Sequence, residues 1–298
     1  MFKILQKTVS TGTVTANYPV EPANISDRFR GRPSFDFDKW KDARPATEVC
    51  PTGAISLSDK GDSRRVTVDY GLCVFCGLCA EASSDQAVHI TQEFELATAE
   101  RRNLVLTAEY ALNADRIQGG LRKVDRHVVK AETDVERLGQ KARETIQKIL
   151  GRSLAIREVD AGSCNGCEVE IVALNNPVHD IERFGIHFVA SPRHADMLLV
   201  TGPVTRNMEL ALLKTHRAMA EPKVVVAVGA CGISGGIFGQ NYACLGSVDK
   251  VLPVDVYIPG CPPRPQALLH GILLAVGRLA EKLHDDRTGF YAVSEVSK

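Results

Sequence analysis

The spacing of the cysteines constrains this chain more than any other feature. Residues 73–79 carry three of them at C-x2-C-x2-C, the way an iron–sulfur motif begins, but Ser83 stands where a fourth is expected. Cys50 lies upstream and is followed by a proline. The 298 residues include nine cysteines and show neither a signal peptide nor an apolar run long enough for a membrane span. We therefore expect a cytoplasmic protein whose clustered cysteines bind metal rather than form disulfides.

A degenerate internal repeat supplies the missing fourth ligand. Two-cluster bacterial ferredoxins carry C-x2-C-x2-C-x3-C-P in each half, and the fourth cysteine of each half binds the other half's cluster. If Cys50 is the fourth cysteine of a first half, the three earlier positions are Trp40, Ala43 and Ala46. These three and Ser83 are the lost positions of one cluster, and the complete set for the other is Cys50, Cys73, Cys76 and Cys79. This part of the chain, residues 30–95, resembles an α+β bacterial-type ferredoxin with one [4Fe-4S] cluster.

Two alternatives to that cluster are open at this point. Four thiolates also suit a tetrahedral zinc site, and Cys73, Cys76 and Cys79 alone can hold a three-iron cluster. The crossed loss of one ligand set favours iron, because it is expected only of a chain whose ancestor bound two clusters. The phrase AISL follows the first half of the repeat and the phrase AVHI follows the second, and both are interpreted as the same short strand. His89, which lies in AVHI, is therefore interpreted as a strand residue rather than a ligand.

A charged connector without cysteine separates the first four cysteines from the last five. Residues 96–151 form this connector, and apolar residues at steps of three and four predict an amphipathic helix over 134–150. A solvated charged spacer is the alternative. Residues 1–29 are expected to form an N-terminal extension. Because 36 basic residues balance 36 acidic ones, the charge gives no support to a nucleic-acid partner.

Residues 152–298 have the pattern of an α/β domain with a parallel sheet. Runs rich in β-branched residues alternate with helical patterns, and these runs are LAIREV, MLLVTG, KVVVAVG and VDVYIPG. Three of the runs end shortly before cysteines, which are Cys164 with Cys167, Cys231, and Cys261. Loops at the carboxyl ends of parallel strands converge, so we expect four thiolates to meet there and hold a second [4Fe-4S] cluster.

Glycines around this second set suit a cluster better than a nucleotide. GACGISGG has glycines at G-x2-G-x2-G instead of G-x-G-x2-G, and a cysteine occupies the turn, which argues against a dinucleotide site. Glycines also let the backbone approach an inorganic core closely. Cys244 has no partner at metal spacing and is interpreted as a small buried residue, although a ligand exchange with Cys231 stays open.

Several charged residues near these cysteines have two interpretations each. Glu168 and Glu170 either assist proton movement at a subunit interface or form an ordinary acidic helix start. Arg157, Arg193 and His194 either make polar contacts around the cluster or are ordinary surface residues.

Four phrases in order carry a specific resemblance, and they are GSCNGCEVEI, SPRHADMLLVTGPVT, VGACGISGGIF and YIPGCPPRP. Residues 152–284 resemble the small, electron-transferring subunit of group 4 membrane-bound [NiFe] hydrogenases of the formate hydrogenlyase and hydrogenase-4 type. The same family includes a subunit of NADH:quinone oxidoreductase, but that enzyme has adjacent cysteines at its first ligand pair, whereas Cys164 and Cys167 are two residues apart as in hydrogenases. The first half of the chain, which contains the ferredoxin-like segment, is similar to the ferredoxin-like subunit of the same complexes. It would be fused in front of the part that resembles the small subunit.

The resemblance implies an α/β flavodoxin-like domain and an electron-transfer subunit without catalytic residues of its own. Its proximal [4Fe-4S] cluster would be held by Cys164, Cys167, Cys231 and Cys261. Single electrons are expected to pass through the two clusters between a donor protein and a large subunit that carries nickel and iron. Membrane-embedded subunits are further expected partners, which would hold the chain at the inner face of the cell membrane. A nickel-free or quinone-reducing relative and a structural zinc scaffold are the alternatives.

Overall fold

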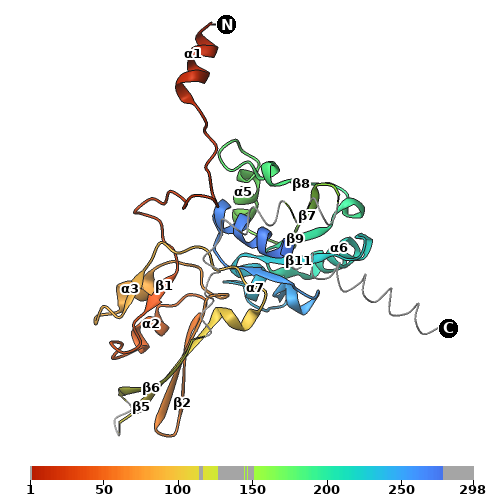
Figure 1. Ribbon diagram of the computed structural model, residues 1–298. Coiled ribbons are helices and arrows are strands. Elements are labelled where there is room, and N and C mark those ends of the chain that lie inside the picture. The colour runs from red at the N-terminus through yellow and green to blue at the C-terminus, as the bar shows by residue number, and fades with distance from the viewer. Residues whose placement is uncertain (1, 114–116, 127–143, 145, 147–150, 278–298) are drawn as a thin grey trace, which may run out of the picture.

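The sheet predicted for the second half of the chain is present and entirely parallel (Figure 1). The computed structural model describes residues 2–113, 117–126, 144, 146 and 151–277. The sheet consists of β7 (Leu154–Asp160), β8 (Ile186–Phe188), β9 (Met197–Thr201), β11 (Val224–Val228) and β13 (Val256–Ile258). Its order in space, β8-β7-β9-β11-β13, is the flavodoxin-like order 2-1-3-4-5. All four predicted runs form strands, while β8, with three residues, is too short for a periodic pattern.

Both faces of this sheet are covered, as its continuous apolar strands require. Leu198 and Val200 lie in one core with side chains of α6 (Arg206–Ala218) and α7 (Gly229–Ser234). Met197 and Leu199 alternate with them and lie in a second core. That core includes side chains of α5 (Gly166–Ala173) and of a helix over 265–277. The result is a three-layer arrangement with the sheet between two layers of helices. The loops at the carboxyl ends of the strands can therefore hold a functional site.

The described residues between 30 and 126 form two antiparallel sheets and two short helices. β1 (Pro33–Phe35) pairs with β4 (Val88–Ile90). A four-stranded sheet has the order β2 (Ile55–Lys60), β3 (Ser63–Asp69), β5 (Val105–Leu112) and β6 (Gln118–Arg126). The helices are α2 (Arg44–Glu48), before β2, and α3 (Leu78–Ala82), after β3. From β1 to β4 the elements therefore follow the order β-α-β-β-α-β.

The remaining described elements lie outside these sheets and helices. They are the N-terminal helix α1 (Phe2–Thr11), the 3-10 turns η1 (Arg101–Leu104), η2 (Ile181–Phe184), η3 (Pro192–His194) and η4 (Val248–Lys250), and the strand pair β10 (Val204–Thr205) and β12 (Cys244–Gly246).

The connector differs from the helical segment that the sequence predicts. Its first part forms β5 and β6, which extend the β2–β3 hairpin into a four-stranded sheet. Tertiary pairing with β3 is the physical reason, because it offers this stretch a ladder of backbone hydrogen bonds that a local charge pattern does not reveal. The predicted helix over 134–150 lies outside the described residues except for 144 and 146, which are helical, and Ile146 is buried.

The positions that the repeat assigns to a lost cluster lie in an apolar core. Trp40 is 2% exposed, and its ring centroid lies 5.2 Å from that of Phe35 and 6.1 Å from that of Phe37. Ala43 and Ala46 are also buried. Aromatic and methyl groups thus occupy positions that the repeat assigns to cysteines.

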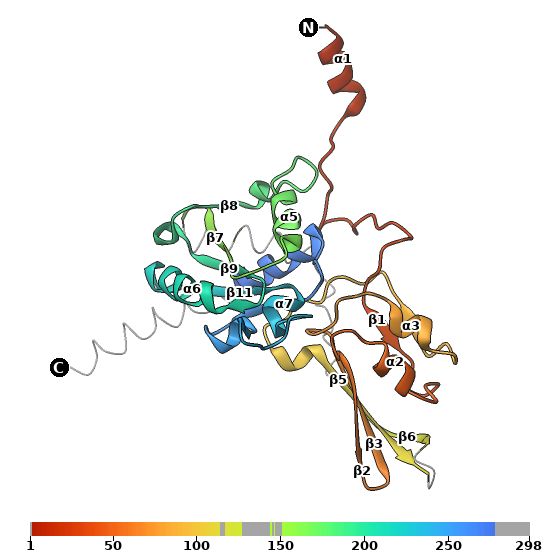
Figure 2. The ribbon, with the colours of Figure 1, turned by 180° about the vertical axis from the view of Figure 1, so that it is seen from behind.

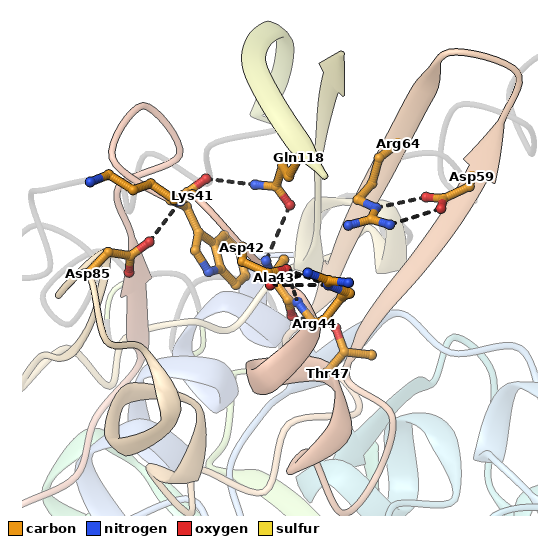
Figure 3. Close-up of polar contacts among 10 residues, drawn as sticks. Lys41, Asp42, Ala43, Arg44, Thr47, Asp59, Arg64, Asp85 and Gln118 are labelled. Carbon is orange, nitrogen blue, oxygen red and sulfur yellow. Dashed lines mark hydrogen bonds and ion pairs between the residues drawn. The ribbon is translucent and has the colours of Figure 1, made fainter. Parts of the chain in front are cut away.

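Hydrogen bonds complete this remodelled region (Figure 3). The buried amide of Gln118 donates to the carbonyl oxygen of Trp40 at 2.6 Å and accepts from the backbone N–H of Ala43 at 3.2 Å. The Ser83 hydroxyl donates to the Asp85 carboxylate at 2.6 Å. These hydrogen bonds and the packed rings therefore stabilise this part of the first half.

Trp40→Ala is expected to lower the free energy of unfolding by about 3–5 kcal/mol, because the surrounding rings cannot fill the cavity that it leaves. Trp40→Phe keeps one ring and is the matched control, with a smaller expected loss. Urea unfolding followed by far-ultraviolet circular dichroism measures both. A loss below about 1 kcal/mol for Trp40→Ala, the size of an average substitution, would contradict this description of the core.

Candidate metal centres

The structure brings the four cysteines of the first predicted set together. Cys50 follows α2, Cys73 and Cys76 lie in the loop after β3, and Cys79 lies in α3. All four line one cavity, whose other walls include Phe35 and further apolar side chains. We call these four residues the first site.

Backbone geometry turns the loop that carries Cys73 and Cys76 toward the cavity. Phe75 and Gly77 both have positive φ, at 55° and 86°, so the chain turns sharply between the cysteines. The backbone N–H of Phe75 donates to Sγ of Cys73 at 3.4 Å. Arg30 donates to the carbonyl oxygen of Cys76 at 2.6 Å and fixes the loop from outside.

Two thiols of the first site, those of Cys73 and Cys79, are poor acids as long as no metal is bound. Burial raises the pKa of Cys73 to about 12 and the pKa of Cys79 to about 11, and the charges of the neighbouring cysteines add to both shifts. Since metals bind the thiolate form, loading this site must release these protons.

The second predicted set also converges, at the carboxyl edge of the parallel sheet. Cys164 and Cys167 follow β7, Cys231 lies in α7 after β11, and Cys261 follows β13. Burial raises the pKa of Cys167, followed by the charges of Glu168 and of the three other cysteines. Burial likewise raises the pKa of Cys231 to about 11, with contributions from the charges of Cys261 and Cys164. We call these four cysteines the second site.

Glycines keep space open beside the sulfurs of the second site. A Cβ added to Gly229 would lie 2.8 Å from Sγ of Cys167, and one added to Gly236 would lie 2.8 Å from Sγ of Cys231. Both glycines have positive φ, at 76° and 54°. The residues present therefore fit a metal group held by these sulfurs, because a side chain at either glycine would displace a cysteine sulfur.

The two sites adjoin. A cavity of about 580 Å³ lies between the halves and is lined by Phe75 from the first loop and Cys261 from the second. A Cβ on Gly71, two residues before Cys73, would lie 2.8 Å from Cγ2 of Ile233 in α7. The loop of the first site thus packs directly on the helix that carries Cys231.

Two further contacts hold the halves in this position, and neither follows from a sequence pattern. Thr98 and Tyr257 exchange two backbone hydrogen bonds of 3.0 and 2.8 Å at β13. The Arg264 guanidinium lies 4.9 Å from the ring centroids of both Phe29 and Phe94. A cation held between two rings from the other half acts as a pin next to Cys261.

The acidic residues near the second site have different surroundings. Both carboxylate oxygens of Glu168 are buried and have no hydrogen-bond partner among the described residues. Burial and, secondarily, the Glu168 charge raise the pKa of Glu158. Glu170 instead lines the cavity between the halves together with Arg264.

Of the two interpretations of Arg193 and His194, the structure favours ordinary surface residues, because both side chains are exposed. Both residues lie in η3, directly before β9. They are therefore at the amino ends of the strands, opposite the cysteine loops. Cys244 is buried in β12, as predicted, and its charge is among those that affect Cys231.

The described residues show neither a site for a single metal ion nor a helix that could cross a membrane. No three His, Cys, Asp or Glu side chains there are placed to hold one metal ion. The ligands of a four-iron cluster stand farther apart than those of one ion, so this absence concerns mononuclear sites. In the same part of the chain, every helix lacks the length or the apolar composition that crossing a membrane requires.

Residues 164–275 match the family described as "NADH ubiquinone oxidoreductase, 20 Kd subunit". A subunit of the NADH-quinone oxidoreductase of Citrifermentans bemidjiense is 48% identical over 124 residues, which are 42% of this chain and 70% of that protein. The chain belongs to this family. The part that matches the family begins at Cys164 and includes the whole second site, whereas the first site lies outside it.

Relatives of the family with other names are equally similar. Formate hydrogenlyase subunit 7 of Escherichia coli K12 is 51% identical over 140 residues, covering 47% of this chain and 55% of that subunit. "Probable membrane-bound hydrogenase subunit mbhJ" of Pyrococcus furiosus is 49% identical over 137 residues, covering 46% and 81%. The chain thus spans about half the length of the first relative and most of the second. All are named as subunits of oxidoreductase complexes.

One solved structure, of the archaeal membrane-bound sulfane sulfur reductase, contains a chain 38% identical to this one. The match covers 45% of this chain and 72% of the other, with a TM-score of 0.38.

Proposed function

We propose that the chain is the electron-transfer subunit of an energy-converting, membrane-associated [NiFe] hydrogenase of the formate hydrogenlyase type. The observation that carries the proposal is the pairing of two four-cysteine sites across one packed interface. In this proposal the first site and the second site each hold one [4Fe-4S] cluster. Such clusters supply one-electron transfer when they are bound.

The first half is proposed to be a ferredoxin-like domain over residues 30–95, preceded by an extension (1–29) and followed by the connector (96–151). Support comes from the order of its elements, β-α-β-β-α-β, and from the pairing of β1 with β4. The crossed ligand set is supported by Cys50, which lines the same cavity as the three cysteines of the C-x2-C-x2-C motif.

Residues of the chain itself determine how the two sites communicate. The contact between Gly71 and Ile233 and the pin formed by Arg264 keep the two cysteine loops adjacent. Apolar side chains line the first cavity beside the cysteines, and the glycines of the second site let the backbone lie close to the sulfurs. An electron then has a short route between the halves.

A large subunit carrying nickel and iron is the proposed partner at the second site. Cys164 and Cys261 are exposed there. Large apolar side chains are exposed on the elements next to the cysteines, and they are Val169 and Val172 in α5 and Ile237, Phe238 and Tyr242 after α7. Exposed apolar side chains beside a site are typical of a surface that a partner covers. An external donor protein would then serve the first site, on the cytoplasmic side of the membrane.

The test is whether nickel accompanies the chain. The tagged full chain, isolated from its host, is expected to bring down a partner containing nickel. Val172→Glu, on the proposed interface, is expected to lower the nickel recovered by about tenfold or more, because it buries a charge in that interface, while the chain keeps its own iron. Ile117→Glu is the control and should change neither metal, because the exposed Ile117 directly precedes β6, a strand that lies far from α5 (Figure 1).

The same experiment separates the alternatives. A partner that copurifies without nickel would replace the hydrogenase proposal by a nickel-free or quinone-reducing relative, which the similarity to a subunit of NADH-quinone oxidoreductase favours as the second candidate. Zinc in the chain itself, with no iron, would favour a structural scaffold instead.

A further inference from the structure

Helix α1 projects from the body of the molecule and buries none of its ten residues. It stands clear of both halves in opposite views (Figures 1 and 2). The segment that follows it is fixed to the body of the molecule. The Thr15 hydroxyl donates to the carbonyl oxygen of Pro177 and the Ala16 backbone N–H donates to that of Val178, each at 2.8 Å. A helix this short that packs on nothing is marginal in water, so a surface that covers one of its faces is needed to stabilise it.

The side chains of α1 separate into two faces. At 3.6 residues per turn, one half of its surface carries Phe2, Ile4, Leu5, Thr8 and Val9, and the opposite half carries Lys3, Gln6, Lys7, Ser10 and Thr11. The apolar face is open to solvent, with exposed fractions of 89% for Phe2, 73% for Ile4, 59% for Leu5 and 81% for Val9.

The charges on α1 indicate what covers this face. Its charged residues are Lys3 and Lys7, both on the polar half, and it has no acidic residue. Helices with lysines on one face and Phe or Leu on the other lie in the plane of a membrane surface, and anionic lipids attract them. Ten residues are about half of the roughly 20 that a membrane span needs.

We propose that α1 binds an anionic lipid bilayer, with Phe2, Leu5 and Val9 at the boundary of the acyl chains and both lysines at the phosphates. The chain then contacts the membrane directly and not only through partner subunits. Because the segment behind α1 is bonded to residues 177 and 178, the loop after α5 would face the bilayer. The proposal does not rest on the metal content of the chain or on the proposed function.

Cosedimentation of the purified full chain with lipid vesicles tests this proposal. One set of vesicles is phosphatidylcholine alone, and the other is equimolar phosphatidylcholine and phosphatidylglycerol. Each lysine near an anionic surface contributes a factor of about five, so binding to the anionic vesicles is expected to be roughly 30-fold tighter. The double variant Lys3→Gln and Lys7→Gln is expected to lose most of that difference, as is the wild type at high salt.

A matched pair of variants tests the orientation of the helix. Leu5→Gln on the apolar face is expected to weaken vesicle binding by about tenfold, because it removes a buried leucine from the lipid contact. Ser10→Gln introduces the same side chain on the polar face and is expected to leave binding unchanged. Neither residue is buried and α1 stands clear of the body (Figures 1 and 2), so both variants should keep the circular dichroism and metal content of the wild type. Absence of binding to anionic vesicles, or equal binding of the two variants, would overturn the proposal and leave the face to a protein partner.

Discussion

Cys50→Ala is expected to lose the signal of one iron–sulfur cluster and to retain the other, so that iron falls from about eight to about four atoms per chain. The reason is the crossed ligand set. Cys50 is 23 residues upstream of Cys73, yet it lines the same cavity as the three cysteines of the motif. Removing it leaves three thiolates for a four-iron cluster. The change is measured by iron analysis and by low-temperature EPR of the dithionite-reduced protein.

Cys244→Ala is the matched control for this experiment. Cys244 is a buried cysteine close enough to Cys231 to affect its pKa, but it belongs to neither site. It is expected to keep both clusters. Two unchanged signals in Cys50→Ala would contradict the crossed ligand set, and loss of the second-site signal in Cys244→Ala would mean that Cys244 has taken the place of Cys231.

Gly229→Ala is expected to abolish the second cluster and leave the first intact. The added Cβ would lie 2.8 Å from Sγ of Cys167 and 3.4 Å from the carbonyl oxygen of Gly260. Backbone strain at φ 76° costs about 1–2 kcal/mol by itself, and the displaced sulfur adds the larger effect on cluster binding. Iron per chain should again fall to about four, now with loss of the other EPR signal.

Gly185→Ala separates the strain from the steric effect. Gly185 has nearly the same φ, 72°, but an added Cβ would find no atom within 4 Å. It is therefore expected to cost a similar strain energy and to keep both clusters. If Gly229→Ala keeps the second signal with unchanged g values, the space beside Cys167 is not needed for the group that binds there.

The parts of the fold that could be predicted were those with a strong hydrophobic pattern in the sequence. The strands β9, β11 and β13 are buried along their whole length, so their apolar runs are continuous and easily recognised, and β7 has such a run over its first three residues. Cysteines at the ends of these strands could be brought together by topology alone, since parallel strands share a carboxyl edge. The core around Trp40 is consistent with the lost ligand set inferred from the repeat.

Other features depend on partners distant in sequence. The β5–β6 hairpin exists because β3 offers it an edge, and its charged sequence suggested a connector instead. The pin at Arg264 depends on Phe29 and Phe94, more than 160 residues away, and a sequence pattern cannot show such a contact. The sequence left two interpretations of Arg193 and His194 open, because their distance from the carboxyl edge of the sheet depends on the position of the short turn η3.

The measurement that tests the central claim most directly is the content of iron and acid-labile sulfide, with a low-temperature EPR spectrum, on the full chain purified without oxygen. Two four-cysteine sites predict about eight irons and two S = 1/2 signals in the reduced protein. About four irons would mean that one of the two sites is not a cluster site. Zinc in place of iron would contradict electron transfer by this chain.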